Sequence, residues 1–267
     1  MSFLDDHYGN YGGLNAAEYV DKHVRGSSEE MLRIAETIRL IPSESTSVLD
    51  VGAGHGVLLK DLESARGIRG VGIEITPSKV EYARAQGVDL RLGAAQRLEF
   101  SDRSFDTVLA CEVVEHLPFG VYEASLKEMA RVARHSVLIT VPNEEQLPFV
   151  RCPYCGASVN PNYHMRSFST ASLTGLVPGF SLIKTIGVGS HRVSPLLSLG
   201  RRWLDRQWPA ELVCASCGFQ STPTSSASAT PLGRLALRKT ARDFARLLPA
   251  RRKATWLIAL YVLDTAA

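Results

Sequence analysis

A short glycine-rich segment constrains the fold of this chain more than any other feature. Residues 48–56 read Val-Leu-Asp-Val-Gly-Ala-Gly-His-Gly, and helix-forming residues follow from Val57 to Glu63. The pattern predicts a strand, a tight turn and a helix N-terminus, because glycine permits positive φ and lets a ligand lie against bare backbone. Val57 stands where the NAD fingerprint G-x-G-x-x-G has its third glycine, and no G-K-[ST] follows as in a P-loop. Both of these nucleotide-binding motifs are therefore excluded.

Strand and helix patterns alternate along most of the chain. The expected strands are residues 47–51, 69–74, 88–92, 105–111, 136–141, 180–188 and 255–263. The expected helices run from Ser27 or Ser28 to before Pro42, and over 57–65, 78–86, 119–133 and 173–177. Alternation at these lengths predicts an α/β fold with a parallel sheet that helices cover on both faces.

Polar residues follow three of these strands. Glu74 ends the second strand, 18 residues after Gly56. Residues 92–96 read Leu-Gly-Ala-Ala-Gln after the third strand, and residues 111–117 read Cys-Glu-Val-Val-Glu-His-Leu after the fourth. In this order, and with the pattern hh-D-h-G-x-G-x-G over the first strand, they resemble the class I S-adenosylmethionine-dependent methyltransferases.

The resemblance implies a Rossmann-like, doubly wound sheet of seven strands, mostly parallel, whose antiparallel last strand lies between the fifth and sixth. It also implies S-adenosylmethionine as the cofactor, with Glu74 holding its ribose. Ala94 stands where the family usually has an acid beside the adenine, so Ala95 and Gln96 remain the candidates for that contact. The cofactor residues expected from the resemblance are Asp50, Gly52, Ala53, Gly54, Gly56, Glu74, Ile75, Ala95, Gln96, Cys111 and Glu112.

Four of the five cysteines form two C-x-x-C pairs, each followed by glycine. The pairs are Cys152/Cys155 and Cys214/Cys217, with 58 residues between them. A C-x-x-C turn presents two thiolates to one tetrahedral ion, so two such turns predict a closed structural zinc site. Redox-active pairs are the main alternative, and disulfides are not expected without a secretory signal. The fifth, Cys111, is interpreted as a small buried residue near the cofactor.

The loop after the fourth expected strand carries the candidates for catalysis, since such sheets bind ligands at the carboxyl ends of their strands. His116 is a candidate general base, and His164 is a second catalytic candidate. Glu-x-x-Glu-His with a later histidine resembles the metal site of small-RNA 2′-O-methyltransferases, and ubiquinone-pathway O-methyltransferases carry a similar Glu-x-x-Glu-His. By that resemblance Glu112, Glu115, His116 and His164 form a second metal site, for magnesium or manganese. Alternatively, Glu112 only contacts the cofactor, Glu115 caps the next helix, and His164 packs a helix or replaces a zinc ligand.

The composition is that of an ordinary globular protein. A chain of 267 residues with 45% hydrophobic residues can build one large core or two modest ones. Met1 is followed by Asp5 and Asp6 rather than by a basic and then an apolar stretch, which argues against a signal peptide. The apolar run from Trp256 to Leu263 is too short to span a bilayer. We therefore expect a cytoplasmic protein without membrane association.

The net charge of +3 conceals an asymmetry along the chain. Residues 231–253 hold eight Lys or Arg against Asp243, a net charge of +7, whereas residues 1–230 sum to −3. The arginines at 234, 238 and 242 form one stripe of an expected helix, beside an apolar stripe. This basic helix could recognise phosphate on a substrate, a nucleic acid or a carrier protein. A solvated amphipathic helix is the simpler interpretation.

We expect three parts in the chain. Residues 1–26, rich in tyrosine and glycine, are expected to form a lid over the cofactor or an ordinary frayed terminus. The methyltransferase core is expected over residues 27–150, 165–188 and 254–267. Residues 151–164 and 189–253 are expected to form an insertion with the zinc knuckles and the basic helix.

Three functions remain open from the sequence. The first is O-methylation of a small molecule in a biosynthetic pathway. The second is metal-assisted 2′-O-methylation of RNA, against which the absence of an added RNA-binding module argues. The third is a cofactor-binding homologue without catalysis, which Ala94 leaves open.

Overall fold

The computed structural model describes residues 15–145, 149–193, 214, 217–219 and 251–264. Its contacts divide the chain into two compact units. Unit 1 comprises residues 1–146, 164–189 and 254–267, and unit 2 comprises residues 147–163 and 190–253. The low-complexity and basic residues 220–250 lie outside the described residues, so the predicted basic helix over them remains a prediction.

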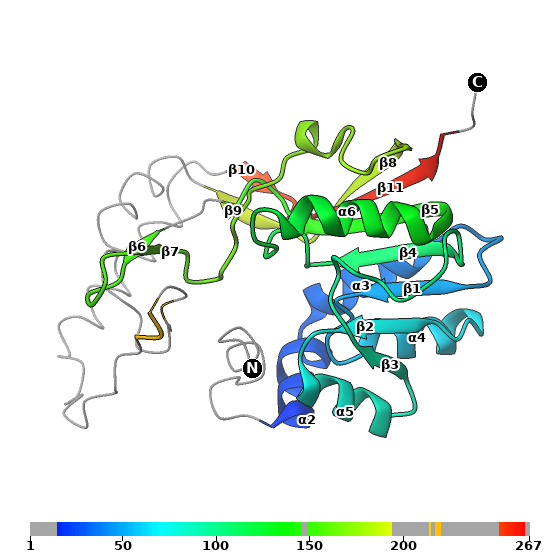
Figure 1. Ribbon diagram of the computed structural model, residues 1–267, viewed down its shortest axis with the longest axis horizontal. Coiled ribbons are helices and arrows are strands. Elements are labelled where there is room, and N and C mark those ends of the chain that lie inside the picture. The colour runs from blue at the N-terminus through cyan, green and yellow to red at the C-terminus, as the bar shows by residue number, and fades with distance from the viewer. Residues whose placement is uncertain (1–14, 146–148, 194–213, 215–216, 220–250, 265–267) are drawn as a thin grey trace. The chain divides into compact units, whose positions relative to one another are not determined.

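Unit 1 contains a seven-stranded sheet with the strand order β3-β2-β1-β4-β5-β11-β8 (Figure 1). The strands are β1 (Val48–Val51), β2 (Val71–Glu74), β3 (Asp89–Leu92), β4 (Phe105–Cys111), β5 (Ala133–Pro142), β8 (Phe180–Val188) and β11 (Trp256–Leu263). Strands β1 to β5 pair in parallel, and β11 pairs antiparallel with both β5 and β8. The predicted fold class is therefore confirmed, including the position of the antiparallel strand.

The helices begin and end at the residues that favour those positions. They are α2 (Ala16–Tyr19), a π-helical segment (Val20–Arg25), α3 (Ser28–Leu40), α4 (Val57–Arg66), α5 (Pro77–Ala85) and α6 (Val121–Val132). The side chain of Ser27 caps α3 by accepting from the N–H of Glu30 at 3.3 Å. Gly67, with φ of 68°, ends α4 in the left-handed conformation that glycine adopts without strain. The helix predicted over 173–177 is wrong: a 3-10 turn at Ala171–Leu173 stands there, before Gly175 with φ of 70°.

Helices cover both faces of the sheet (Figure 1), and the strands alternate accordingly. In β4, the fully buried Val108 and Ala110 pack in one apolar cluster with Met129 of α6. The intervening Leu109 packs in a second cluster with α3 and α4, beside residues such as Ile38. Strands buried on both faces carry continuous apolar runs, which is why β4 and β5 were recognisable in the sequence. None of the described helices has the length and hydropathy that a membrane-spanning helix requires.

Unit 2 contains two short antiparallel ribbons in its described part. One pairs β6 (Val150–Arg151) with β7 (Ser158–Val159), and the other pairs β9 (His191–Val193) with β10 (Arg251–Lys253). Val150, Val159 and Tyr163 pack with Cys152 and Cys214 in a small buried cluster. Unit 2 therefore has an apolar cluster of its own around two of its cysteines.

Candidate functional site

The parallel strands of unit 1 place their carboxyl ends at one edge of the sheet, where a cavity of about 630 Å³ lies. Ten of the eleven predicted cofactor residues line this cavity. They are Asp50, Gly52, Ala53, Gly54, Glu74, Ile75, Ala95, Gln96, Cys111 and Glu112. The eleventh, Gly56, instead packs inside the fold, where a Cβ would lie 3.2 Å from Ala83 and Val88. The volume lies in the range of small-molecule sites.

The glycine loop after β1 gives the cavity its shape. Gly52 has φ of 75°, and a Cβ on it would lie 2.4 Å from Val113 Cγ2, so only glycine fits. Gly54 has φ of 55°, and a Cβ on it would meet nothing within 4 Å, so the loop leaves open space at this point. The N–H groups of Gly52 and Ala53 donate to Ile73 O at 2.7 and 3.0 Å. These two amides therefore hold the loop to β2 rather than face a ligand.

Glu74 at the end of β2 is 6% exposed and holds the loop from the other side. Its Oε2 accepts from the N–H of Gly54 at 3.0 Å, and its Oε1 accepts from the N–H of Thr76 at 2.9 Å. A carboxylate has about four acceptor positions, so both oxygens can still accept from a ligand hydroxyl.

Two buried carboxylates face the cavity with oxygens that have no hydrogen-bond partner among the described residues. They are Asp50 Oδ1 and Glu112 Oε1. Burial raises the pKa of Asp50 to about 7, although the charge of Arg33 opposes it, and burial raises the pKa of Glu112 to about 8. Glu112 also has φ of 57°, a strained conformation for a residue other than glycine. Such unsatisfied buried acceptors fit a cationic group of a ligand.

Three residues at or beside this cavity were not predicted from the sequence. Arg33 of α3 lines the cavity, donates to Glu30 Oε2 at 2.6 Å, and lies 5.7 Å above the ring of Trp256. The indole Nε1 of Trp256 donates to Glu112 Oε2 at 2.9 Å. Lys79 of α5 lines the cavity, and burial lowers its pKa. Arg33 and Trp256 come from opposite ends of the chain, so no spacing could have indicated them.

The predicted second metal site is assembled only in part. Glu115, His116 and His164 each offer a ligand atom within 4.8 Å of the others. Glu112 does not belong to this group, since Trp256 holds one of its oxygens. The Glu115 side chain is fully buried, neither oxygen has a hydrogen-bond partner among the described residues, and burial raises its pKa well above the usual value.

The two histidines pack edge to face, and a residue missed in the sequence orients one of them. The ring centroids of His116 and His164 are 4.5 Å apart at 76°. The Nδ1 atom of His164 contacts the carboxylate of Glu145, which fixes the orientation of the imidazole ring. His116 lines the cavity, whereas His164 is not among its lining residues. Glu145 lies three residues beyond the end of β5, too far in sequence from His164 for any motif to link them.

All four paired cysteines meet in unit 2. Their sulfur atoms lie within 4.8 Å of one another, with 3.7 Å between Cys152 and Cys217 and 3.6 Å between Cys155 and Cys214. These separations exceed the S–S bond of about 2.05 Å in a disulfide. They match the edges of a tetrahedron with Zn–S bonds of about 2.3 Å, which are about 3.8 Å long.

The two C-x-x-C turns have the same local structure. Gly156 and Gly218 donate to the carbonyl oxygens of Cys152 and Cys214 at 2.9 and 2.8 Å, with φ of 75° and 73°. Although burial opposes it, N–H groups of the turn lower the pKa of Cys152 to about 7. The donor set and its geometry therefore fit a tetrahedral zinc ion.

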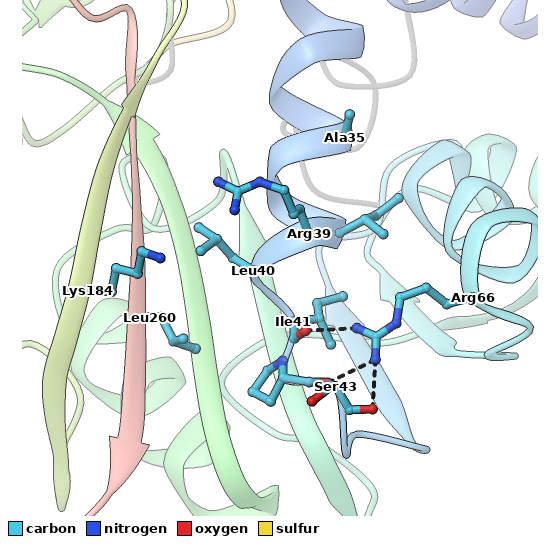
Figure 2. A pocket seen from close by; sticks show the side chains of 10 residues that line it. Ala35, Arg39, Leu40, Ile41, Ser43, Arg66, Lys184 and Leu260 are labelled. Carbon is cyan, nitrogen blue, oxygen red and sulfur yellow. Dashed lines mark hydrogen bonds between the residues drawn. The ribbon is translucent and has the colours of Figure 1, made fainter.

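A second cavity, of about 740 Å³, lacks acidic and metal-binding side chains among its described lining residues. It lies beside the loop that precedes β1, at the opposite end of that strand from the glycine loop. Figure 2 shows Arg66 turned toward this loop, where it donates to the carbonyl oxygens of Ile41, Pro42 and Ser43 at 2.8, 2.9 and 3.1 Å. Its lining residues in the described chain include no carboxylate, histidine or cysteine.

Comparisons with known proteins agree with this arrangement. A family model described as a methyltransferase domain matches residues 49–140. The chain is 33% identical over 189 residues to a ubiquinone biosynthesis O-methyltransferase from Methylobacterium nodulans, with 62% of this chain and 69% of that protein covered. It is 31% identical over 121 residues to norajmaline N-methyltransferase from Rauvolfia serpentina, with 42% and 41% covered.

A solved structure shows the same fold at low identity. A SAM-dependent methyltransferase from Archaeoglobus fulgidus matches with a TM-score of 0.55 and 16% identity, and the match covers 93% of this chain and 100% of that one. For three of the curated relatives, however, the chain spans about half of their length or less, namely 41%, 33% and 54%.

Proposed function

Because this chain belongs to the class I S-adenosylmethionine-dependent methyltransferases, we propose that it methylates a small-molecule acceptor at a hydroxyl group. The observation that carries the proposal is that ten residues expected to contact the cofactor line one cavity, at the carboxyl ends of the parallel strands. When bound there, S-adenosylmethionine supplies a methyl group on a positively charged sulfur, which an acceptor oxygen can attack in line.

The residues around the cavity fit the two polar ends of this cofactor. Glu74 would accept the ribose hydroxyls while it keeps its bonds to Gly54 and Thr76. The unpartnered oxygens of Asp50 and Glu112 would accept from the ammonium group. Arg33 would hold the carboxylate at the same end, because it lines the cavity and already balances these acids. At the other end, Ala95 and Gln96 line the space left for the adenine.

We assign removal of the acceptor proton to His116. Its imidazole lines the cavity, and histidine is the commonest general base near neutral pH. His164 supports its ring from the side, and the carboxylate of Glu145 fixes the orientation of His164. Loss of a positioning group of this kind is expected to lower turnover more than it weakens cofactor binding.

A divalent ion is an alternative use of the same groups. One buried carboxylate and two imidazoles, Glu115, His116 and His164, can hold magnesium or manganese with positions left open. Bound there, the ion would favour ionisation of an acceptor hydroxyl. This arrangement would also serve 2′-O-methylation of RNA, so RNA belongs in any acceptor screen. Restored turnover on adding magnesium or manganese to chelator-treated enzyme would support it, and full turnover without either ion would exclude it.

We also propose that the cysteines of unit 2 hold a structural zinc ion. The four thiols within 4.8 Å, and the matched N–H···O bonds of both turns, support this. An ion there would join residues 152–155 to residues 214–217, which are far apart in sequence, and so stabilise unit 2. Elemental analysis of protein purified under reducing conditions is expected to find about one zinc per chain.

The experiment that tests the proposed function has two stages. Calorimetry with S-adenosylhomocysteine, the demethylated product, should show binding to the wild type and roughly 10–100-fold weaker binding to Glu74→Ala. The surface variant Glu63→Gln is the control, since Glu63 pairs only with exposed Arg69 in the described chain. An acceptor screen read by mass spectrometry then separates methyl transfer from binding alone. Absence of product binding in folded wild-type protein would refute the proposal, and binding without transfer would favour a non-catalytic homologue.

A further inference from the structure

Unit 2 carries a positive charge that the rest of the chain does not share. Its 81 residues include 13 Lys or Arg and three Asp or Glu, a net charge of +10. The residues of unit 1 include 17 Lys or Arg against 24 Asp or Glu, a net charge of −7. A separation this large indicates a surface for an anionic partner, because like charges within one small unit oppose its folding.

Five of these 13 cationic residues lie in the described part of unit 2, and four of the five belong to one short ribbon. Strands β9 and β10 comprise three residues each, His-Arg-Val and Arg-Arg-Lys, without an acid. Their antiparallel register places Arg252 opposite Arg192 and Lys253 opposite His191. Three arginines and one lysine thus stand on a six-residue ribbon that contains no acid, a composition that favours an anionic ligand. Arg251 and Arg252 are exposed to solvent and available to such an anion.

The type of cation points to phosphate. Eleven of the 13 cationic residues in unit 2 are arginine. The planar guanidinium donates two parallel hydrogen bonds to phosphate or carboxylate oxygens, which the ammonium group of lysine cannot do. Arginine is therefore the residue expected where phosphate groups are bound.

The cofactor cavity cannot provide this recognition itself. Its lining includes four carboxyl groups, Glu30, Asp50, Glu74 and Glu112, and two basic side chains, Arg33 and Lys79. Burial favours the uncharged forms of Asp50, Glu112 and Lys79, because it raises the pKa of both acids and lowers the pKa of the lysine. Arg33 is already paired with Glu30. Arg33 is the one arginine among the described lining residues, and the proposed function assigns it to the carboxylate of the cofactor. A phosphate group on the acceptor would therefore need an arginine from another part of the chain.

We infer that the β9–β10 ribbon binds phosphate or pyrophosphate groups and thereby recruits phosphate-bearing acceptors to this enzyme. Recruitment of an acceptor rests on the proposed function. Phosphate binding does not, because it can be measured without turnover. A nucleotide-linked and a lipid-linked acceptor share this chemistry. Uridine diphosphate and vesicles that contain phosphatidic acid are the two probes that distinguish these sources.

The test compares two double variants of the zinc-loaded full chain that lose the same charge. Arg251→Gln/Arg252→Gln alters the ribbon. The control Arg69→Gln/Arg97→Gln alters unit 1, where these side chains are 88% and 83% exposed. Calorimetry with inorganic pyrophosphate should show binding to the wild type that weakens as salt is added. Binding should weaken about tenfold in the ribbon variant and by less than twofold in the control.

Further measurements keep the inference open to refutation. Unchanged binding of S-adenosylhomocysteine would verify that the ribbon variant is folded, and Arg251→Lys/Arg252→Lys should recover part of the pyrophosphate affinity because it keeps the charge. If wild-type protein does not bind pyrophosphate, or if the control loses as much affinity as the ribbon variant, the inference is wrong. The inference is also wrong if single-stranded RNA binds far more tightly than uridine diphosphate and vesicles that contain phosphatidic acid. The exposed ring of Tyr154, at 79%, could stack on a base, and the partner would then be a nucleic acid. Failure of cofactor binding with intact pyrophosphate binding would refute only the proposed function.

Discussion

Alanine substitutions at three glycines with similar backbone conformations separate two effects on stability, the strain of a positive φ and the collision of an added Cβ. Gly52, Gly54 and Gly67 have φ of 75°, 55° and 68°. Alanine in this conformation costs about 1–2 kcal/mol, of which roughly 0.4–1 kcal/mol is offset because alanine also restricts the unfolded chain. Gly67→Ala, at the end of α4 with nothing within 4 Å of its Cβ, measures this conformational effect alone. It should lower the free energy of unfolding by about 1 kcal/mol or less.

Gly52→Ala adds a collision to the same conformational effect. Its Cβ would lie 2.4 Å from Val113 Cγ2 and 3.2 Å from Cγ1, which the buried loop cannot relieve without moving. Overpacking of this kind costs about 1–3 kcal/mol, so the total loss should be about 1–4 kcal/mol. For a chain of this size that corresponds to a fall in Tm on the order of 2–16 °C.

Gly54→Ala should weaken ligand binding rather than stability. Its Cβ meets no protein atom within 4 Å, so its stability should match that of Gly67→Ala. The added methyl group would instead project into space that the cofactor is proposed to occupy, and binding of S-adenosylhomocysteine should weaken by about 10–100-fold. Gly67→Ala should bind as the wild type does.

The assays are urea unfolding followed by circular dichroism and calorimetric titration of S-adenosylhomocysteine, both on all three variants. If Gly52→Ala is as stable as Gly67→Ala, the close approach of Val113 is not present in the protein. If Gly54→Ala binds the product as tightly as the wild type, the cavity behind the glycine loop is not the cofactor site.

Three further predictions test other parts of the structure. Cys155→Ser should lose most of the zinc that we propose for unit 2 and should destabilise that unit, whereas Cys111→Ser, outside the four-cysteine cluster, should have the zinc content of the wild type. Elemental analysis of both variants measures this, and equal zinc contents would contradict the site. Asp50→Asn should be more stable than the wild type near neutral pH, because the unfolded chain releases the Asp50 proton near pH 3.8 while burial holds it in the folded chain to about pH 7. The stability that this retained proton provides below pH 3.8 is lost as the pH rises to about 7, so the advantage of the variant should grow over that window to at most about 4 kcal/mol. Urea unfolding at several pH values measures this advantage. If the free energy of unfolding depends on pH in the same way in both proteins, the assignment is refuted. Trp256→Phe should lower the free energy of unfolding by about 1–3 kcal/mol, since Glu112 Oε2 loses its buried donor, and no change in urea unfolding would mean that water replaces the indole.

Most strands and helices of unit 1 were predictable because each is encoded by residues that lie close together in the sequence. The run 48–51 followed by three glycines encodes a strand, a turn and a helix start within ten residues, and the same holds for 71–74 before Pro77. The order of seven strands, including the antiparallel β11, followed from a family resemblance that rests on such local motifs. The helix predicted over 173–177 failed because its apolar residues pack through a 3-10 turn and Gly175 rather than through a regular helix.

The candidate site was predictable only where its residues follow strand ends. Parallel strands place their carboxyl ends together, so Asp50, Glu74 and Glu112 were expected to meet, and they line one cavity. The cysteine pairs were predictable because C-x-x-C spacing is itself a structural motif. The sequence could not indicate that Glu112 belongs with Trp256 rather than with the Glu115 group.

The chain by itself therefore determined the fold class, the glycine loop and the pairing of cysteines, since each depends on residues within a few positions of one another. Only the tertiary structure decided that Arg33 and Trp256 meet at Glu112, and that Glu145 orients His164. These contacts join residues 19 to 223 positions apart in the chain, and burial, which shifts the pKa of Asp50, Glu112 and Glu115, exists only once the chain has packed around them.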